Sequence, residues 1–299
     1  MKVAAVIFDL FGTLVQPLNG SLLLRRLAEF GIHPAPEAAY WIARGFPPAA
    51  AVLEMGVDPV DALALHLREQ LPSLVDFIKL IQMRFPAAQP PQAHTITEAE
   101  VILQVAIEGA TLVDGAKPLL DWLVSQGIAL RLLSNLSTPF KTIIAHFKLY
   151  HWFPHLILSC ETGLLKPDPR AFERALAGLK CTAAEVMMVG DNWQSDILGA
   201  LRSGLQPVFV DSTKNHPCRQ LLKDASPFFE IETSGDIRFR KQLREQLRPL
   251  IPVALEAIEA APTDHLEIDL ENCLRLTPLS QVTVIDNCSD LMVVLNTQN

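Results

Sequence analysis

The most regular feature of the chain is a set of short, continuously apolar runs that recur between longer, helix-like segments. Residues 3–8 are apolar without polar alternation, which is the pattern of a strand buried on both faces. Similar runs occupy residues 128–133, 156–158, 186–189 and 207–210. Strands that alternate with helices in this way predict an α/β fold with a doubly wound parallel sheet, in which ligands bind beyond the carboxyl ends of the strands.

A different pattern separates the first two of these runs. Residues 17–111 are rich in Ala and Leu at helical spacing and are interrupted by prolines, so we expect a helical insert. Helices are predicted at residues 98–109, with Thr97 as the cap, and at residues 116–126. We expect three parts. Residues 1–16 and 112–235 form a sheet domain, residues 17–111 form an inserted helical domain, and residues 236–299 form a C-terminal extension.

The C-terminal extension changes character again. Residues 237–247 form a basic helix candidate, and residues 266–271 alternate strictly between apolar and polar side chains. Residues 281–296 offer a second strand-like stretch, so a β-hairpin is expected. The extension is also the candidate surface for a homo-oligomer, because an exposed edge strand can pair with a second chain.

Composition narrows the classes of partner. Apolar residues make up 49% of the chain, yet no run approaches the ~18 uninterrupted apolar residues of a membrane helix, so no membrane partner is expected. The first apolar run ends at Asp9, too early for an export signal, and the five cysteines form no CxxC pair, which favours a cytoplasmic location with reduced thiols. A net charge of −8 disfavours nucleic acid. An anionic substrate would therefore need a local positive site.

Two polar motifs come at the ends of predicted strands. Asp9 follows the first strand, and Gly12 lets the backbone bend sharply beside it, next to Thr13. Ser134 and Asn135 follow the second strand, where a hydroxyl and the N–H groups of the turn could hold a phosphate oxygen. Each motif also has a structural alternative, because a strand-end aspartate is often a turn residue and a serine here suits an N-cap.

Two further motifs carry charge. Lys166 lies beside Pro167, which restricts the loop that presents the lysine; an ammonium held in this way can neutralise a phosphate and orient a carboxylate. Asp191 and Asp196 follow another predicted strand, and their hard oxygen ligands suit Mg²⁺. The alternatives are a solvated surface lysine and an aspartate that caps a helix.

Together these motifs resemble those of the haloacid dehalogenase-like hydrolase superfamily, in its helical-cap class. They occur in the family's order as Asp9-Leu10-Phe11-Gly12-Thr13, Ser134-Asn135, Lys166-Pro167 and Gly190-Asp191 through Asp196. The resemblance implies a Rossmann-like core, with residues 17–111 as the cap. It also implies an Mg²⁺-dependent hydrolase, of which a phosphatase acting on a small phosphorylated metabolite is the first candidate.

The resemblance assigns a role to each motif. Asp9 would be the nucleophile, forming an aspartyl-phosphate that water hydrolyses, with Ser134 and Lys166 as the other catalytic residues. The residues implied in substrate binding are Ser134, Asn135, Lys166, Gly12 and Thr13. The residues implied in Mg²⁺ binding are Asp9, Phe11 through its backbone carbonyl, Asp191 and Asp196.

The sequence departs from the family pattern at Phe11, where the family's phosphatases usually carry a second aspartate that protonates the leaving group. A phenylalanine keeps the backbone carbonyl but transfers no proton, and loss of such a group typically costs on the order of 10²–10⁴ in rate. One alternative is a phosphatase limited to good leaving groups, or one whose acid lies in the cap. The cap candidates are His33, Tyr40, Glu54, His66 and His94.

Other outcomes remain open. The family's dehalogenases carry an aromatic Tyr at the position of Phe11, and displacement of halide needs no leaving-group acid. Phosphonate cleavage would need a cap lysine, for which Lys79 is the one candidate. A catalytically impaired phosphate-binding or partner-binding protein is the alternative from another class. Substrate choice would rest on cap side chains that could face either the site or solvent: Arg25, Arg26, Trp41 and Arg44.

Overall fold

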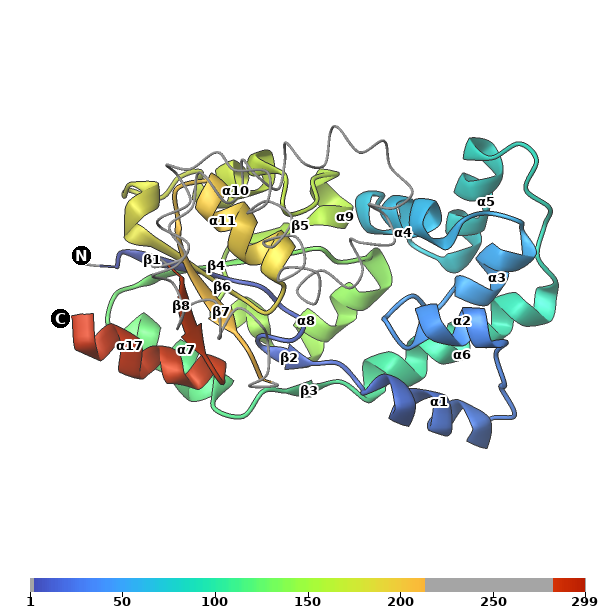
Figure 1. Ribbon diagram of the computed structural model, residues 1–299, viewed down its shortest axis with the longest axis horizontal. Coiled ribbons are helices and arrows are strands. Elements are labelled where there is room, and N and C mark those ends of the chain that lie inside the picture. The colour runs from blue at the N-terminus through green and yellow to red at the C-terminus, as the bar shows by residue number, and fades with distance from the viewer. Residues whose placement is uncertain (1–2, 213–281, 299) are drawn as a thin grey trace, which may run out of the picture.

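A computed structural model of the chain, which describes residues 3–212 and 282–298, contains a six-stranded parallel sheet (Figure 1). The strand order is β5-β4-β1-β6-β7-β8. The strands are β1 (Ala5–Phe8), β4 (Ala129–Ser134), β5 (Leu156–Leu158), β6 (Val186–Gly190), β7 (Gln206–Val210) and β8 (Thr283–Ile285). The predicted doubly wound α/β fold is therefore confirmed, with β1 between β4 and β6 at the centre.

Burial on both faces explains why the strands are continuously apolar. In β1, Val6 and Phe8 pack into one hydrophobic cluster and Ala5 and Ile7 into another, and all four are fully buried. The side chains of a strand alternate between its two faces, so each face of this sheet receives every second residue. A sheet covered on one side only would have required a polar residue at alternate positions.

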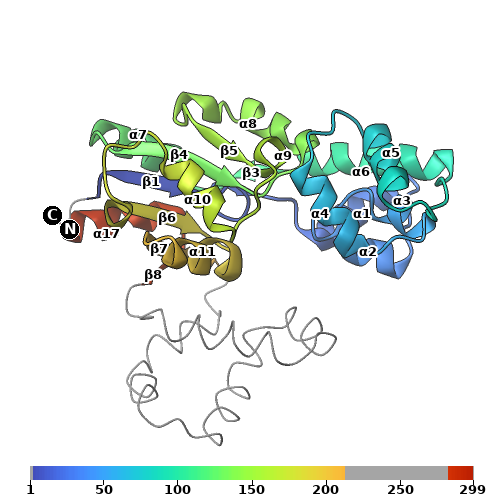
Figure 2. The ribbon, with the colours of Figure 1, turned by 90° about the horizontal axis from the view of Figure 1, so that it is seen from above.

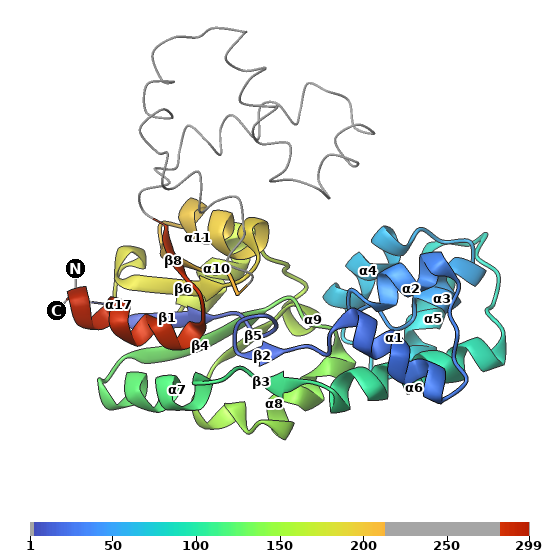
Figure 3. The ribbon, with the colours of Figure 1, turned by 60° about the horizontal axis from the view of Figure 1, so that its bottom comes forward.

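Helices cover both faces of the sheet (Figure 3). One face packs against α7 (Ala116–Ser125), α8 (Thr142–His146) and α17 (Leu291–Gln298), and the other against α10 (Pro169–Leu176) and α11 (Gly199–Arg202). Short helical turns complete the loops: η1 (Thr138–Lys141), η2 (Leu149–His151), α9 (Ser159–Thr162), η3 (Ala183–Glu185), η4 (Trp193–Leu198) and η8 (Cys288–Asp290).

The helical insert lies to one side of the sheet (Figures 1 and 2). Its helices are α1 (Gly20–Glu29), α2 (Pro36–Ile42), α3 (Ala49–Glu54), α4 (Pro59–Arg68), α5 (Leu74–Arg84) and α6 (Ala93–Glu108). They enclose a hydrophobic core of their own, which includes Phe46 and Phe77. The insert joins the sheet through β2 (Val15–Gln16) and β3 (Thr111–Leu112), which pair in antiparallel fashion. No helix in the described parts of the chain is both long and apolar enough to cross a bilayer.

Two sequence-based expectations about local structure are wrong. Thr97 does not cap a helix, because α6 begins earlier and the Thr97 hydroxyl donates to the Ala93 carbonyl inside it. The strand-like stretch expected at residues 281–296 is wrong in its extent. Of its described residues, only β8 forms a strand, which pairs in parallel with β7, and a helix begins at Leu291; the hairpin partner expected at residues 266–271 lies outside the described residues.

The end of the chain instead packs against the sheet domain. Leu291 and Leu295 are buried in the same hydrophobic cluster as α7, and their spacing of four residues is helical. The apolar run between them looked strand-like because it contains Val293 and Val294. The helix predicted at residues 237–247 and the alternating segment at 266–271 lie outside the described residues.

Candidate active site

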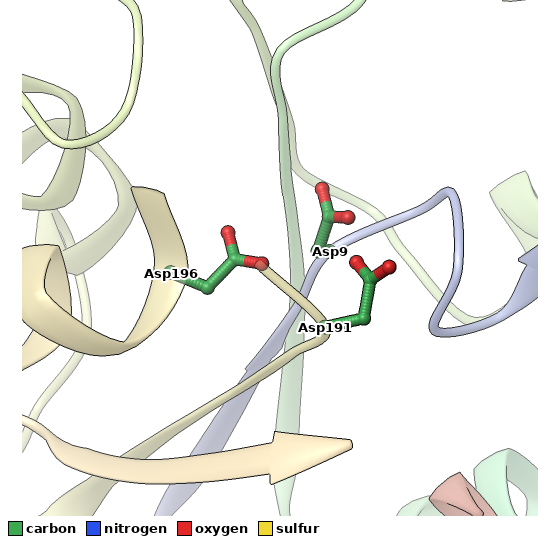
Figure 4. A group of neighbouring side chains, drawn as sticks. All are labelled: Asp9, Asp191 and Asp196. Carbon is green, nitrogen blue, oxygen red and sulfur yellow. The ribbon is translucent and has the colours of Figure 1, made fainter. Parts of the chain in front are cut away.

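Three aspartates meet beyond the carboxyl ends of the two central strands. Asp9 follows β1, Asp191 follows the neighbouring β6, and Asp196 lies on the π-helical turn η4. One carboxylate oxygen from each lies within 4.8 Å of the others. The three carboxyl groups approach one another from separate segments (Figure 4). The predicted convergence of strand ends therefore brings together residues that are almost 190 positions apart, at 9 and 196.

Two glycines make this close approach sterically possible. A Cβ atom at Gly12 would lie 1.9 Å from Oδ2 of Asp191, and one at Gly190 would lie 2.3 Å from Oδ2 of Asp196. Gly12 also has a φ of +76°, which side-chain-bearing residues rarely adopt. The turn after Asp9 therefore requires glycine for two separate reasons.

Lys166 provides the positive charge of the site. Its Nζ lies 2.6 Å from Oδ1 of Asp9 and 2.6 Å from Oδ1 of Asp196, and the side chain is almost fully buried. Burial alone would lower the pKa of Lys166, but the charges of Asp196 and Asp9 outweigh that effect and hold the pKa above its ordinary value. The ammonium is therefore charged and shared between two carboxylates.

One ammonium does not balance three carboxylates. Burial, followed by the charge of Asp9, raises the pKa of Asp196 and also of Asp191. Asp191 as a whole residue is exposed, but its carboxyl group lies close against Gly12. This close approach accounts for the removal of water from the carboxyl group. Crowded carboxylate oxygens are hard ligands of the type that Mg²⁺ binds, and a divalent cation would relieve their repulsion. The donor set of Asp9, Asp191 and Asp196 thus fits Mg²⁺.

The other predicted site residues lie around this group. Ser134 is the last residue of β4, the strand beside β1, and is buried. Thr13 is fully buried, and within the described part of the chain its hydroxyl has no hydrogen-bond partner. Asn135 forms hydrogen bonds with the backbone of Lys166 on both sides of its amide group. Sequence reasoning missed this last link, although the position of Asn135 directly after Ser134 offered a signal.

Phe11 is partly buried, and its ring packs edge-on against Phe140 at 5.7 Å between centroids. It therefore brings an aromatic surface to the turn after Asp9, at the position where phosphatases of the family usually carry an acid. A hydrogen bond near Phe140 also connects this region to the helical insert. Thr138, two residues before Phe140, accepts a hydrogen bond from the Leu71 N–H at 3.0 Å. This link between η1 and the loop after α4 was not predicted.

None of the cap residues proposed as a substitute acid has a hydrogen bond, ion pair or ring contact with Asp9 among those the described residues form. His66 is buried against the rings of Phe46 and Phe77, and burial lowers its pKa to about 4. Glu54 accepts hydrogen bonds inside the insert. The remaining three candidates, His33, Tyr40 and His94, are exposed.

The cap side chains considered for substrate recognition face solvent or the insert itself. Arg25 and Arg26 are exposed on α1. Arg44 lies over the ring of Tyr40, at 3.5 Å from the ring centroid. Trp41 packs against the core of the insert. Among the described residues, these four side chains form no hydrogen bond or ion pair with the aspartate cluster.

Comparison with known proteins gives a consistent family. The family model described as haloacid dehalogenase-like hydrolase matches residues 3–204. A phosphoserine phosphatase of Thermus thermophilus is 39% identical over 114 residues, which are 38% of this chain and 43% of the relative. A ribulose-1,5-bisphosphate 5-phosphatase of Halopiger xanaduensis is 30% identical over 161 residues, 54% of this chain and 66% of the relative. The matches thus span less than two thirds of these relatives.

Among solved structures, an L-2-haloacid dehalogenase of Xanthobacter autotrophicus superposes with a TM-score of 0.52 at 16% identity, covering 99% of this chain and 100% of that one. At such low identity the likeness supports the fold alone.

Proposed function

This chain belongs to the haloacid dehalogenase-like hydrolases, and we propose that it is an Mg²⁺-dependent phosphatase acting on a small phosphorylated metabolite. The observation that carries the proposal is the meeting of Asp9, Asp191, Asp196 and Lys166 in one group. A nucleophilic carboxylate, a fixed cation and a set of hard oxygen ligands are what phosphoryl transfer to a carboxylate requires. The phosphatase relatives support the same reaction class.

In the proposed reaction, an Asp9 oxygen attacks phosphorus and the bond from phosphorus to the leaving oxygen breaks. The product is an aspartyl-phosphate, which water hydrolyses to inorganic phosphate and free Asp9. Ser134 and Lys166 hold oxygens of the transferred group, together with backbone N–H groups beside Gly12 and Thr13. Mg²⁺, held by Asp9, Asp191, Asp196 and the carbonyl of Phe11, would offset charge on the phosphoryl oxygens. Residues 17–111 act as the cap over this site.

Among the described residues, no leaving-group acid is assigned beside Asp9, and this restricts the leaving group. Phe11 transfers no proton, the five cap candidates form no hydrogen bond, ion pair or ring contact with Asp9 in the described part of the chain, and Asp191 and Asp196 are assigned to Mg²⁺, so the leaving oxygen departs with its negative charge. We therefore expect the rate of formation of the aspartyl-phosphate to rise steeply as the pKa of the leaving alcohol falls. The described residues supply no assigned base for hydrolysis of the intermediate either, so the adduct should accumulate.

The primary test is a panel of phosphate monoesters assayed with Mg²⁺ and with EDTA. Wild type should show Mg²⁺-dependent release of phosphate, strongest for esters of acidic alcohols, and intact-mass spectrometry should detect phosphorylated Asp9. The Asp9→Asn variant should show neither. If no ester in the panel is turned over, the phosphatase proposal fails and a phosphate-binding or partner-binding role takes its place.

Phe11→Asp tests the restriction on the leaving group. The variant should gain about 10²–10⁴ in rate on esters of weakly acidic alcohols and much less on activated esters. A melting curve is the necessary control, because the ring contact with Phe140 is lost and aromatic pairs contribute about 0.5–1.5 kcal/mol. If the folded variant shows no gain on any ester, the missing acid at position 11 is not the cause of the leaving-group dependence.

A second candidate function is the hydrolysis of 2-haloacids, which the aromatic side chain of Phe11 favours. Displacement of halide by a carboxylate needs no leaving-group acid, but it also gives no use to the crowded Asp191 and Asp196. Chloride release from a 2-haloacid in EDTA, abolished in Asp9→Asn, would support this candidate. Dependence on Mg²⁺ would count against it.

A further inference from the structure

The side-chain amide of Asn135 is joined to the backbone of Lys166 at two points. The Lys166 N–H donates to Oδ1 of Asn135 at 2.8 Å, and Nδ2 of Asn135 donates to the Lys166 carbonyl at 3.0 Å. The two residues are 31 positions apart and follow different strands, β4 and β5. A two-point contact of this kind fixes both position and orientation, which a single hydrogen bond does not.

Neighbouring contacts join the same two loops. The Leu136 N–H donates to the hydroxyl of Ser159 at 2.9 Å, and Lys141 forms an ion pair with Glu161. The segment after β4 is therefore tied to the segment after β5 along its length. Of these ties, the one made by Asn135 is the one that ends on Lys166 itself.

The proposed reaction changes what the ammonium of Lys166 contacts. Its Nζ lies 2.6 Å from Asp9, but Asp9 loses its full carboxylate charge while it carries a phosphoryl group. The contact from Asn135 is to the backbone and does not change at that step. Backbone anchoring thus keeps the ammonium in place when one of its ion pairs weakens.

We propose that Asn135 is a positioning residue that acts through Lys166, rather than the direct substrate contact that its motif suggests. Its kinetic consequences rest on the proposed phosphatase function, but its effect on Lys166 itself does not. Asn135→Ala should leave Lys166 less well fixed and more accessible. Asn19→Ala is the matched control, because Oδ1 of Asn19 also accepts a backbone hydrogen bond, from Ser21, but at the start of α1 in the insert.

The first experiment measures acetylation of Lys166 by acetic anhydride, followed by peptide mass spectrometry on the full chain. In wild type the amine is buried between two carboxylates and should react slowly. Labelling should rise at least about threefold in Asn135→Ala and stay at the wild-type level in Asn19→Ala. A melting curve shows whether each variant is folded. Asn135→Asp, which keeps an acceptor for the Lys166 N–H, is the second variant if alanine is not tolerated.

The second experiment is a double-mutant cycle of Asn135→Ala and Lys166→Met, with single-turnover rates on p-nitrophenyl phosphate. Loss of two hydrogen bonds predicts that the single-turnover rate constant of Asn135→Ala at saturating substrate falls roughly 10- to 100-fold, with little change in the substrate concentration that gives half of it. In the Lys166→Met background the same substitution should change the rate by less than about threefold, because the residue through which it acts is absent.

The outcomes separate this proposal from the proposed function. Unchanged labelling of Lys166 in a folded Asn135→Ala variant would overturn the positioning role, whether or not the protein is an enzyme. Additive losses of rate in the double-mutant cycle would overturn it as well, and would indicate that Asn135 contacts the substrate directly. Raised labelling in a protein that turns over no phosphate ester would support the positioning role and refute the phosphatase.

Discussion

Acidic pH should destabilise the protein through His66. This side chain is buried on α4 against the rings of Phe46 and Phe77, and burial lowers its pKa from 6.5 to about 4. The unfolded chain therefore binds a proton below pH 6.5, whereas the folded chain binds it only near pH 4. The stabilising effect of neutral His66 is complete above pH 6.5 and is lost as the pH falls toward 4.

The size of the effect follows from the two pKa values. A difference of about 2.5 units corresponds to roughly 3 kcal/mol in the free energy of unfolding at full protonation, and to about 2 kcal/mol between pH 7 and pH 5. His66→Leu should remove this part of the pH dependence. Because Nδ1 of His66 has no hydrogen-bond partner among the described residues, leucine breaks no such bond there and should cost little at pH 7.

The assay is urea unfolding at pH 7, 6 and 5 at constant ionic strength, followed by circular dichroism. His94→Leu is the matched control, since His94 is an exposed histidine of the same insert and its loss should leave the pH dependence of wild type. If His66→Leu loses as much stability on acidification as wild type does, the reasoning from burial of the imidazole is wrong.

Three further predictions concern the site and its junction with the insert. Gly12→Ala should abolish Mg²⁺-dependent turnover, because its Cβ would meet Asp191, whereas Gly31→Ala, at a similar φ of +74° but with open space around it, should only lower the melting temperature. Lys166→Met should lower the free energy of unfolding by roughly 3–5 kcal/mol in EDTA, because it leaves buried carboxylates without their cation; a loss below about 1 kcal/mol would show that the ion pairs contribute little. Thr138→Val should speed proteolysis between the insert and the sheet domain, because it removes the hydrogen bond to Leu71, while Thr142→Val, whose hydroxyl bonds within its own segment, should not.

Much of the fold could be predicted from the sequence because its strands are buried on both faces. The runs that became β1, β4, β5, β6 and β7 contain almost no polar residues, and each lies within a few residues of its predicted place. The end of the chain was misjudged for the same reason, since a short apolar run fits a buried strand and a buried helix equally well. Its helical state depends on the surface that Leu291 and Leu295 cover.

The sequence by itself determined the chemical groups of the candidate site. The order Asp9, Ser134, Lys166, Asp191 and Asp196, at strand ends or on the loops that follow strands, was enough to expect a cluster, because parallel strands place their carboxyl ends at one edge of a sheet. That expectation needs only topology. The glycines at 12 and 190 could likewise be expected near the turns, although not the atoms they avoid.

Only the tertiary structure decided which side chains meet beyond that edge. The bonds from Asn135 to Lys166, the burial of His66 among phenylalanines and the link from Thr138 to the insert join residues 11 to 67 positions apart. Local sequence pattern governs the conformation of each segment, but a contact between segments depends on how their surfaces pack. For that reason the sequence could name an acid, a base or an amide, while its partner became known only when the helices and strands were assembled.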